Sequence, residues 1–152
     1  MFLKSLLEQY GDKKIKIFID MDGVIADYNV GIPYDYHLKR PLYDSIKKLE
    51  EISKMPNVEL FILSATRMTE GYEQKQGWLD KYVPFMKKEN RVIVSREANN
   101  MEQSSVLKCN YLKSLEDDGS VIVVIDDDPK ILKEIKDLDI GIVTLKDTVL
   151  VD

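Results

Sequence analysis

Cysteine and histidine are nearly absent from this chain of 152 residues, which contains one of each. A single cysteine, Cys109, excludes an internal disulfide and suits the reducing cytoplasm, where we expect the protein to act. We expect Cys109 to be a buried helix residue rather than a reactive thiol. Because His37 is the only histidine, metal sites built from Cys and His are excluded as well. Any bound metal must be held by oxygen, which points to Mg²⁺.

The chain also lacks long apolar runs and dense basic tracts. No stretch approaches the roughly 20 apolar residues that cross a membrane. The first ten residues include Lys4 and Glu8 and do not resemble a signal peptide. The formal net charge is −5 and the pI is near 5.0, so we expect neither a membrane partner nor stable binding along duplex nucleic acid. A nucleotide or a nucleic-acid end is still compatible with this charge.

What the chain does contain is an alternation of short apolar runs and amphipathic segments, over a length typical of one domain, residues 1–152. The expected strands are 15–19, 58–63, 91–95, 121–125 and 140–145. The expected helices are 2–10, 41–54, 72–82, 104–115 and 129–137. This order predicts a three-layer, Rossmann-like α/β fold, with a parallel sheet of about five strands and helices on both faces. In such sheets ligands bind beyond the carboxyl ends of the strands.

Two acidic clusters follow the two most apolar of these strands. Asp20 and Asp22 come after the first strand, and Asp126 and Asp127 close the fourth. An isolated Asp-x-Asp is often a turn or a helix cap, and the next residue, Asp128, is well explained as a cap of the helix that follows. Two carboxylate clusters at one sheet edge repel each other unless a cation neutralises them. The pattern therefore predicts a metal site at this edge.

A phosphate-binding element is predicted at the end of the second strand, where a hydroxyl and the adjacent backbone amides can bind phosphoryl oxygens. Its candidate residues are Ser64, Ala65, Thr66 and Arg67. A cation must also balance the charge of a bound phosphate. Lys108, near the middle of the segment before the fourth strand, is our candidate, with Arg67 and Arg96 as competitors.

These four pieces, in this order, resemble the haloacid dehalogenase (HAD) superfamily of phosphotransferases over about residues 15–145. The resemblance implies a Mg²⁺-dependent phosphomonoester hydrolase in which Asp20 is the nucleophile and forms an aspartyl-phosphate. Asp22 would protonate the leaving oxygen and later activate water. Ser64 and Lys108 would bind the phosphoryl group. The implied metal ligands are Asp20, Asp22 through its backbone carbonyl, Asp126 and, in support, Asp127.

A narrower resemblance links residues 20–28, 72–82 and 125–129 to the 5′(3′)-deoxyribonucleotidases, which favours a nucleotide or another small phosphorylated metabolite as substrate. Those enzymes carry a helical cap after the first motif, whereas only residues 29–40 stand in that place here. We therefore expect minimal or no cap, and in its place either a surface loop or a β-hairpin flap over the site. The exposed residues of such a flap would be Tyr34, Tyr36 and His37.

Three alternatives stay open at this stage. A capless site also resembles the 3′-phosphatase domain of polynucleotide kinases, which acts on nucleic-acid ends. A receiver domain of two-component signalling combines an acidic pocket, a parallel sheet and a lysine. It needs an aspartate after the third strand, however, and this chain has Val94, Ser95 and Arg96 there. A non-catalytic, phosphate-binding member of the superfamily would keep the same acidic residues.

Overall fold

The computed structural model describes residues 2–28 and 35–151. Its centre is a five-stranded, all-parallel sheet in the order β3-β2-β1-β4-β5. The strands are β1 (Ile15–Ile19), β2 (Val58–Thr66), β3 (Arg91–Ser95), β4 (Val121–Asp126) and β5 (Val143–Lys146). The α/β class with a parallel sheet, predicted from the alternation of apolar runs and amphipathic segments, is confirmed.

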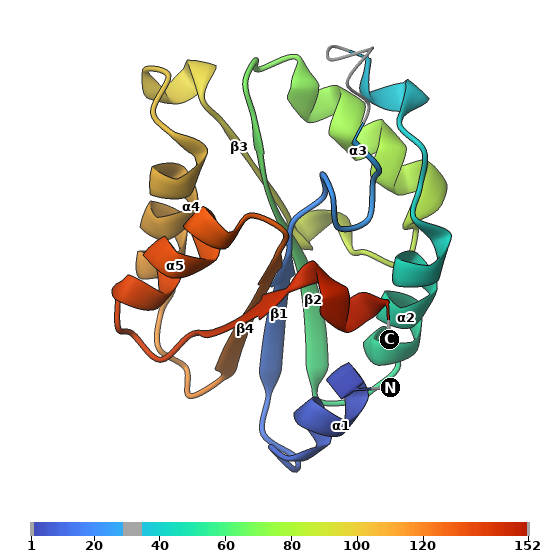
Figure 1. Ribbon diagram of the computed structural model, residues 1–152, viewed down its shortest axis with the longest axis vertical. Helices are drawn as coiled ribbons and strands as arrows, with labels where there is room; N and C mark the ends of the chain where they lie inside the picture. Colours follow the sequence, from blue (N-terminus) through green and yellow to red (C-terminus); the bar gives the residue numbers. More distant parts are fainter. Residues whose placement is uncertain (1, 29–34, 152) are drawn as a thin grey trace.

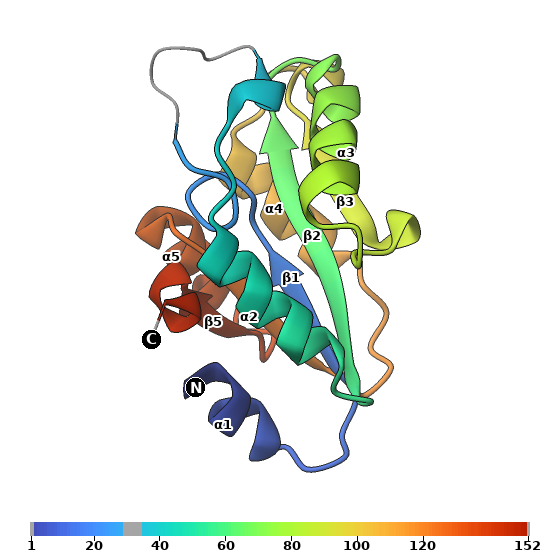
Figure 2. The ribbon, with the colours of Figure 1, turned by 90° about the vertical axis from the view of Figure 1, so that its right-hand side faces the viewer.

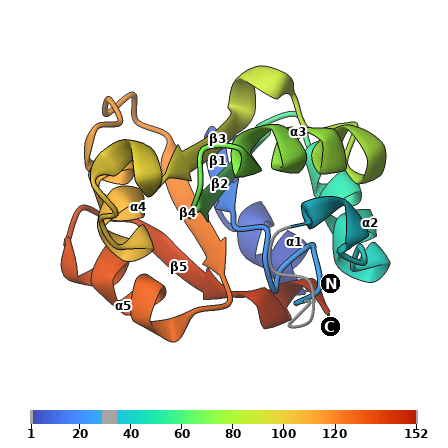
Figure 3. The same ribbon diagram turned by 90° about the horizontal axis from the view of Figure 1, so that it is seen from above.

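Helices cover both faces of the sheet, which gives the three layers seen from above in Figure 3. The α-helices are α1 (Phe2–Glu8), α2 (Tyr43–Ser53), α3 (Gly71–Tyr82), α4 (Ser104–Lys113) and α5 (Pro129–Asp137). The short 3₁₀ helices are η1 (Tyr36–Leu38), η2 (Lys88–Asn90), η3 (Glu97–Asn99) and η4 (Asp147–Leu150). In Figure 1, α4 and α5 lie on one side of the sheet, and α1, α2 and α3 lie on the other. Within the described residues, none of the helices combines the length and the apolar character that a membrane span requires.

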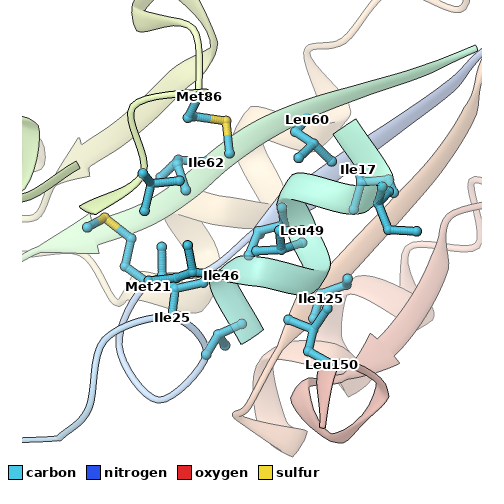
Figure 4. Close-up of a cluster of buried hydrophobic side chains, with 14 of the residues drawn as sticks. Ile17, Met21, Ile25, Ile46, Leu49, Leu60, Ile62, Met86, Ile125 and Leu150 are labelled. Atoms are coloured by element: carbon cyan, nitrogen blue, oxygen red, sulfur yellow. The ribbon is translucent and has the colours of Figure 1, made fainter. Parts of the chain in front are cut away.

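Two hydrophobic cores hold these layers together, because successive residues of a strand point to opposite faces of the sheet. Ile17 of β1 belongs to the larger core, which packs under α2 with residues such as Leu49 and Ile62 (Figure 4). Phe18, the next residue along β1, belongs to the core under α4 and α5. Cys109 is buried in this second core, in agreement with the prediction that it is a buried residue of a helix.

Three element boundaries differ from the prediction, each for a physical reason. Pro41 does not open α2 but forms a bridge with Ala26, so the helix begins two residues later. Strand β2 does not stop at Ser64, because pairing with β3 continues through Ser64 and Ile93 to the last residue of the strand. Strand β5 begins at Val143, three residues later than predicted, because Gly141 has a φ of +81°, which lies outside the strand region.

The described part of the 29–40 segment packs on α3 instead of forming a hairpin. Residues 36–38 form η1, and Trp78 Nε1 donates a hydrogen bond to the Lys39 carbonyl at 3.0 Å. The expectation that Tyr36 is exposed is wrong, because its side chain is buried. Its ring packs edge-on against the ring of Trp78, with 5.8 Å between the two ring centres. His37 is exposed as expected. The first part of the predicted flap, including Tyr34, lies outside the described residues.

Candidate active site

The centre of the site is a buried lysine that bridges carboxylates on two adjacent strands. Asp20 follows β1 directly, and Asp126 is the last residue of β4. The Asp20 backbone N–H donates to the Ile125 carbonyl, which holds the two strand ends side by side. Lys108, one turn into α4, places its Nζ 3.0 Å from Asp20 Oδ1 and 2.8 Å from Asp126 Oδ2. Lys108, the lysine that the sequence suggested as the phosphate-binding cation, therefore contacts Asp20, the candidate nucleophile.

Asp127 completes a cluster of carboxylates. Single oxygen atoms from Asp20, Asp126 and Asp127 all lie within 4.8 Å of one another. The turn after β1 makes room for them, because Gly23 has a φ of +80° and a Cβ at that position would overlap Asp127 Oδ2. Tyr28 donates a hydrogen bond to the same oxygen. A set of oxygen ligands at this spacing suits Mg²⁺, which binds its ligands at about 2.0–2.1 Å.

Burial and crowding raise the pKa of all the carboxyl groups in this cluster. Burial raises the pKa of Asp20 to about 6, and the Lys108 ammonium opposes this shift while the Asp126 charge adds to it. Burial also raises the pKa of Asp126 and of Asp127. At Lys108 burial lowers the pKa, but the charges of Asp20 and Asp126 outweigh it, so the pKa of the ammonium is raised. A cation bound by the carboxylates would favour their charged forms and lower their pKa values.

The raised pKa of Asp20 predicts how the stability of the metal-free protein depends on pH. The folded state binds the Asp20 proton more tightly than the unfolded state, so stability from this group is lost as the pH rises from 3.8 to about 6. By this shift alone, Asp20→Asn should gain on the order of 3 kcal/mol relative to the wild type between pH 4 and pH 7. Urea unfolding in the presence of EDTA measures the difference. A difference that does not change with pH would contradict the raised pKa.

A second buried lysine, Lys75 on α3, lies at the end of β2. Its Nζ donates to Ser64 Oγ at 2.7 Å and to the Ala65 carbonyl at 2.8 Å, and it lies 3.3 Å from Asp22 Oδ2. Burial lowers the pKa of the Lys75 ammonium, against the charges of Asp22 and Asp20. Since Ser64 Oγ accepts from Lys75, its own hydroxyl proton is left to donate to an anion. The end of β2 therefore offers two donors, one of them charged.

The carboxylate of Asp22 is held by two lysines and lies outside the cluster formed by the other carboxylates. Its Oδ1 lies 2.5 Å from Lys39 Nζ, and its Oδ2 contacts Lys75. Although burial raises the pKa of Asp22, the ammonium groups of Lys75 and Lys39 outweigh burial and lower it. A metal contact by Asp22, if it forms, is left to the backbone carbonyl. The carboxylate faces the β2–α3 side of the site.

The other residues proposed for phosphate binding are the last two of β2, Ala65 and Thr66, and the residue that follows the strand, Arg67. The Ala65 carbonyl accepts from Lys75, and Thr66 Oγ1 donates to the carbonyl of Met68, two residues further along the chain, at 3.1 Å. Arg67 is exposed, and its guanidinium has no ion-pair partner in the part of the chain that the structure describes. The structure therefore does not place Arg67 at the carboxylates that Lys108 contacts.

The second competing arginine has a structural contact of its own. Arg96 donates to the carbonyl groups of Glu102 and Met101, at 2.8 and 3.1 Å, and so holds the loop between β3 and α4. It is not brought to the carboxylates. Asp128 caps α5 by accepting from the Lys130 N–H at 2.9 Å, as its position before the helix predicted.

Sequence reasoning missed Lys75 and Lys39. A signal for Lys75 was available, because it precedes the buried Trp78 and Leu79 by three and four positions and so falls on the inner face of α3. A lysine at a core position needs a charged or polar partner. Lys39 offered no such signal, because its placement depends on the hydrogen bond between its carbonyl and Trp78.

The fold of this chain is similar to the folds of two solved structures. A chain from the Pnkp1/Rnl/Hen1 RNA repair complex superposes with a TM-score of 0.67 at 16% identity, over 90% of this chain and 43% of the other. The N-terminal part of the protein BF1531 from Bacteroides fragilis, which contains a phosphatase domain complexed with Mg, superposes with a TM-score of 0.56 at 13% identity, over 95% of this chain and 39% of the other.

The chain thus spans about two fifths of each of these solved chains. Identities of 16% and 13% show a shared fold, and the chemistry must be argued from the residues of this chain. No family model and no curated protein sequence matches it.

Proposed function

We propose that the protein is a Mg²⁺-dependent phosphomonoester hydrolase of the HAD type, with residues 1–152 acting as one catalytic domain in the cytoplasm. The observation that carries this proposal is the buried Lys108 ammonium between the carboxylates of Asp20 and Asp126. A fixed positive charge at this point orients the nucleophile and stabilises charge that develops on a phosphoryl group. The phosphatase domain with Mg among the solved structures of this fold supports the proposal.

The first half of the proposed reaction transfers the phosphoryl group to the protein. An oxygen of Asp20 attacks phosphorus, and the bond between phosphorus and the ester oxygen breaks. The bonding electrons go to the leaving oxygen, which takes a proton from the Asp22 carboxyl group. Ser64 and Lys108 donate to the phosphoryl oxygens, and Lys75 adds a second positive charge beside Ser64.

The second half returns the protein to its starting state. The Asp22 carboxylate accepts a proton from a water molecule, whose oxygen attacks phosphorus of the aspartyl-phosphate. The bond between phosphorus and the Asp20 oxygen breaks, its electrons return to the carboxylate, and inorganic phosphate leaves. The lowered pKa of Asp22 keeps its carboxylate ionised, so the group is free of a proton and can accept this one. Before the first half, Asp22 must take up a proton from water and exchange its contact with Lys39 for the leaving oxygen, and the proton that it accepts in the second half restores this state.

The carboxylate cluster fits a divalent cation on the evidence of its own chemistry. Asp20, Asp126 and Asp127 supply oxygen ligands close together, and burial, which raises the pKa of each, makes their charged forms costly unless a cation lies beside them. Mg²⁺ at these residues would supply charge neutralisation for an anionic substrate that approaches an anionic nucleophile.

Mg²⁺ should therefore stabilise the folded protein. At a concentration of about 100 times its Kd, the expected gain is about 2.7 kcal/mol, which raises the melting temperature by roughly 5–10 °C for a chain of this size. Asp126→Asn should abolish most of this increase, whereas Asp137→Asn on the exposed surface of α5 should keep it. Thermal unfolding with and without MgCl₂ measures the effect. An equal shift in wild type and Asp126→Asn would place the ion elsewhere.

The activity is tested by release of phosphate from p-nitrophenyl phosphate. The expected result is turnover with MgCl₂ and none with EDTA. Absence of turnover on this compound, on a panel of nucleotides and sugar phosphates, and on 3′-phosphorylated oligonucleotides would leave a phosphate-binding protein without catalysis. The panel also separates the candidate substrates.

The substrate class that we favour is a small phosphorylated metabolite, with nucleotides among the candidates because of the resemblance of residues 20–28 to the deoxyribonucleotidases. A 3′-phosphatase acting on nucleic-acid ends is the second candidate. It is supported by the superposition on a chain of an RNA repair complex.

A further inference from the structure

A cleft beside the candidate active site is not used by the chemistry proposed above. It has a volume of about 250 Å³ and lies between η1 and the loop that joins β2 to α3, two segments that lie close together at the upper end of Figure 2. Asp22, Ala65 and Lys75 border both the cleft and the site, whereas Asp20, Ser64 and Lys108 do not line the cleft. A group bound in the cleft would therefore lie on the leaving-group side of Asp22, apart from the transferred phosphoryl group.

A buried hydroxyl group without a partner lies in the lining of this cleft. The Tyr36 side chain is only 7% exposed, and no described residue meets its hydroxyl with ordinary hydrogen-bond geometry, although the Asp22 carboxylate lies near it. Burial raises the pKa of this hydroxyl, and the Asp22 carboxylate beside it raises the pKa further, both by its charge and as a neighbouring hydrogen-bond acceptor. A buried polar group without a hydrogen bond costs about 1–3 kcal/mol. Such a group is expected where a ligand supplies the missing partner.

The charged groups around Tyr36 are mostly donors. Lys39 Nζ lies 4.8 Å from the centre of the Tyr36 ring, and Arg67 lines the cleft with a guanidinium that has no ion-pair partner among the described residues. The first turn of the twelve-residue helix α3 also borders the cleft, and no side chain caps its N-terminus. Two acidic residues also line the cleft: Asp22, which is paired with Lys39 and Lys75, and Glu70, which is paired with neither lysine. Donors at a helix N-terminus favour an anion.

We propose that this cleft binds a second anionic group on the leaving group, so that the preferred substrate is a phosphomonoester that carries another phosphate. Lys39, Arg67 and the Tyr36 hydroxyl are its donors. This inference rests on the proposed function and names the substrate class of the same site. It also gives Lys39 a role in turnover, since an anion that attracts the Lys39 ammonium would free Asp22 Oδ1 to meet the leaving oxygen.

The test compares pairs of substrates that differ by one phosphate. Adenosine 3′,5′-bisphosphate is compared with adenosine 3′-monophosphate, and fructose 1,6-bisphosphate with fructose 1-phosphate. In at least one pair we expect kcat/KM to be about tenfold higher for the bisphosphate, which corresponds to about 1.4 kcal/mol. The pair that shows the larger ratio distinguishes a nucleotide from a sugar substrate. Ratios near one in both pairs would overturn the inference.

Substitutions test whether the preference for a bisphosphate arises in the cleft. Arg67→Gln should reduce the ratio to near one, whereas Lys133→Gln, on the opposite side of the sheet, should keep the wild-type ratio. Tyr36→Phe should reduce the ratio by severalfold and change the melting temperature little, because the hydroxyl makes no hydrogen bond of ordinary geometry in the free protein. A wild-type ratio in Arg67→Gln and in Tyr36→Phe would overturn the placement of the second anion in this cleft.

Binding to Asp20→Asn separates this inference from the proposed function. This variant cannot turn over by the proposed mechanism, so calorimetry with MgCl₂ reads affinity alone. We expect a Kd about tenfold lower for the bisphosphate of the preferred pair. That result without hydrolysis by the wild type would reject the proposed function and keep the subsite. Equal Kd values, alongside normal hydrolysis of p-nitrophenyl phosphate by the wild type, would reject the subsite alone.

Discussion

Asp20→Asn is expected to lower kcat for the Mg²⁺-dependent hydrolysis of p-nitrophenyl phosphate by at least about a thousandfold. The asparagine amide occupies nearly the same volume, but it cannot attack phosphorus. The variant should still fold, because it removes a buried charge whose pKa burial has already raised to about 6. The free energy of unfolding at neutral pH without metal should therefore not fall. Loss of activity together with intact stability is the expected signature of a nucleophile.

The matched control is Asp137→Asn, which makes the same chemical change on the exposed surface of α5. It should hydrolyse p-nitrophenyl phosphate at the wild-type rate. Rapid quenching of the wild type with labelled substrate should place label on the protein, and Asp20→Asn should carry none. Equal rates in Asp20→Asn and the wild type would exclude Asp20 as the nucleophile, whatever the metal dependence.

The sheet and its acidic edge could be predicted from the sequence because both follow from local patterns. Continuous apolar runs such as residues 121–125 indicate buried strands, and alternation with helices makes those strands parallel. The carboxyl ends of such strands meet at one edge, so Asp20 and Asp126 had to lie near each other. The helix before β4 then covers this edge, which brings Lys108 within reach of both carboxylates.

The leaving-group side of the site could not be predicted in this way. Lys39 reaches Asp22 only because η1 packs on Trp78, and that contact joins residues 39 positions apart in the sequence. The same packing buries Tyr36, which the sequence suggested would be exposed. Tertiary contacts of a short irregular segment decide these positions, and such contacts leave no periodic pattern in the sequence.

Lys108→Met is expected to have the largest effect on stability. The methionine keeps much of the length of the side chain but leaves Asp20 and Asp126 buried without their shared partner. Removing one member of a buried ion pair costs about 3–5 kcal/mol, so the metal-free variant should be strongly destabilised at neutral pH. It should also lose most activity, because the charge that orients Asp20 is gone. Urea unfolding with EDTA measures the first effect, and p-nitrophenyl phosphate turnover the second.

Two conditions should restore stability to Lys108→Met if the loss comes from uncompensated carboxylates and not from packing. Lowering the pH to about 5 protonates Asp20, whose pKa burial raises to about 6, and favours the neutral form of Asp126, whose pKa burial also raises. Mg²⁺ neutralises them instead and should recover stability at neutral pH. Lys113→Met, on the exposed last turn of the same helix, should show neither the loss nor the recovery. A loss in Lys108→Met that neither acid nor Mg²⁺ relieves would mean that Lys108 acts by packing. Lys108 would then not be the charge that orients Asp20.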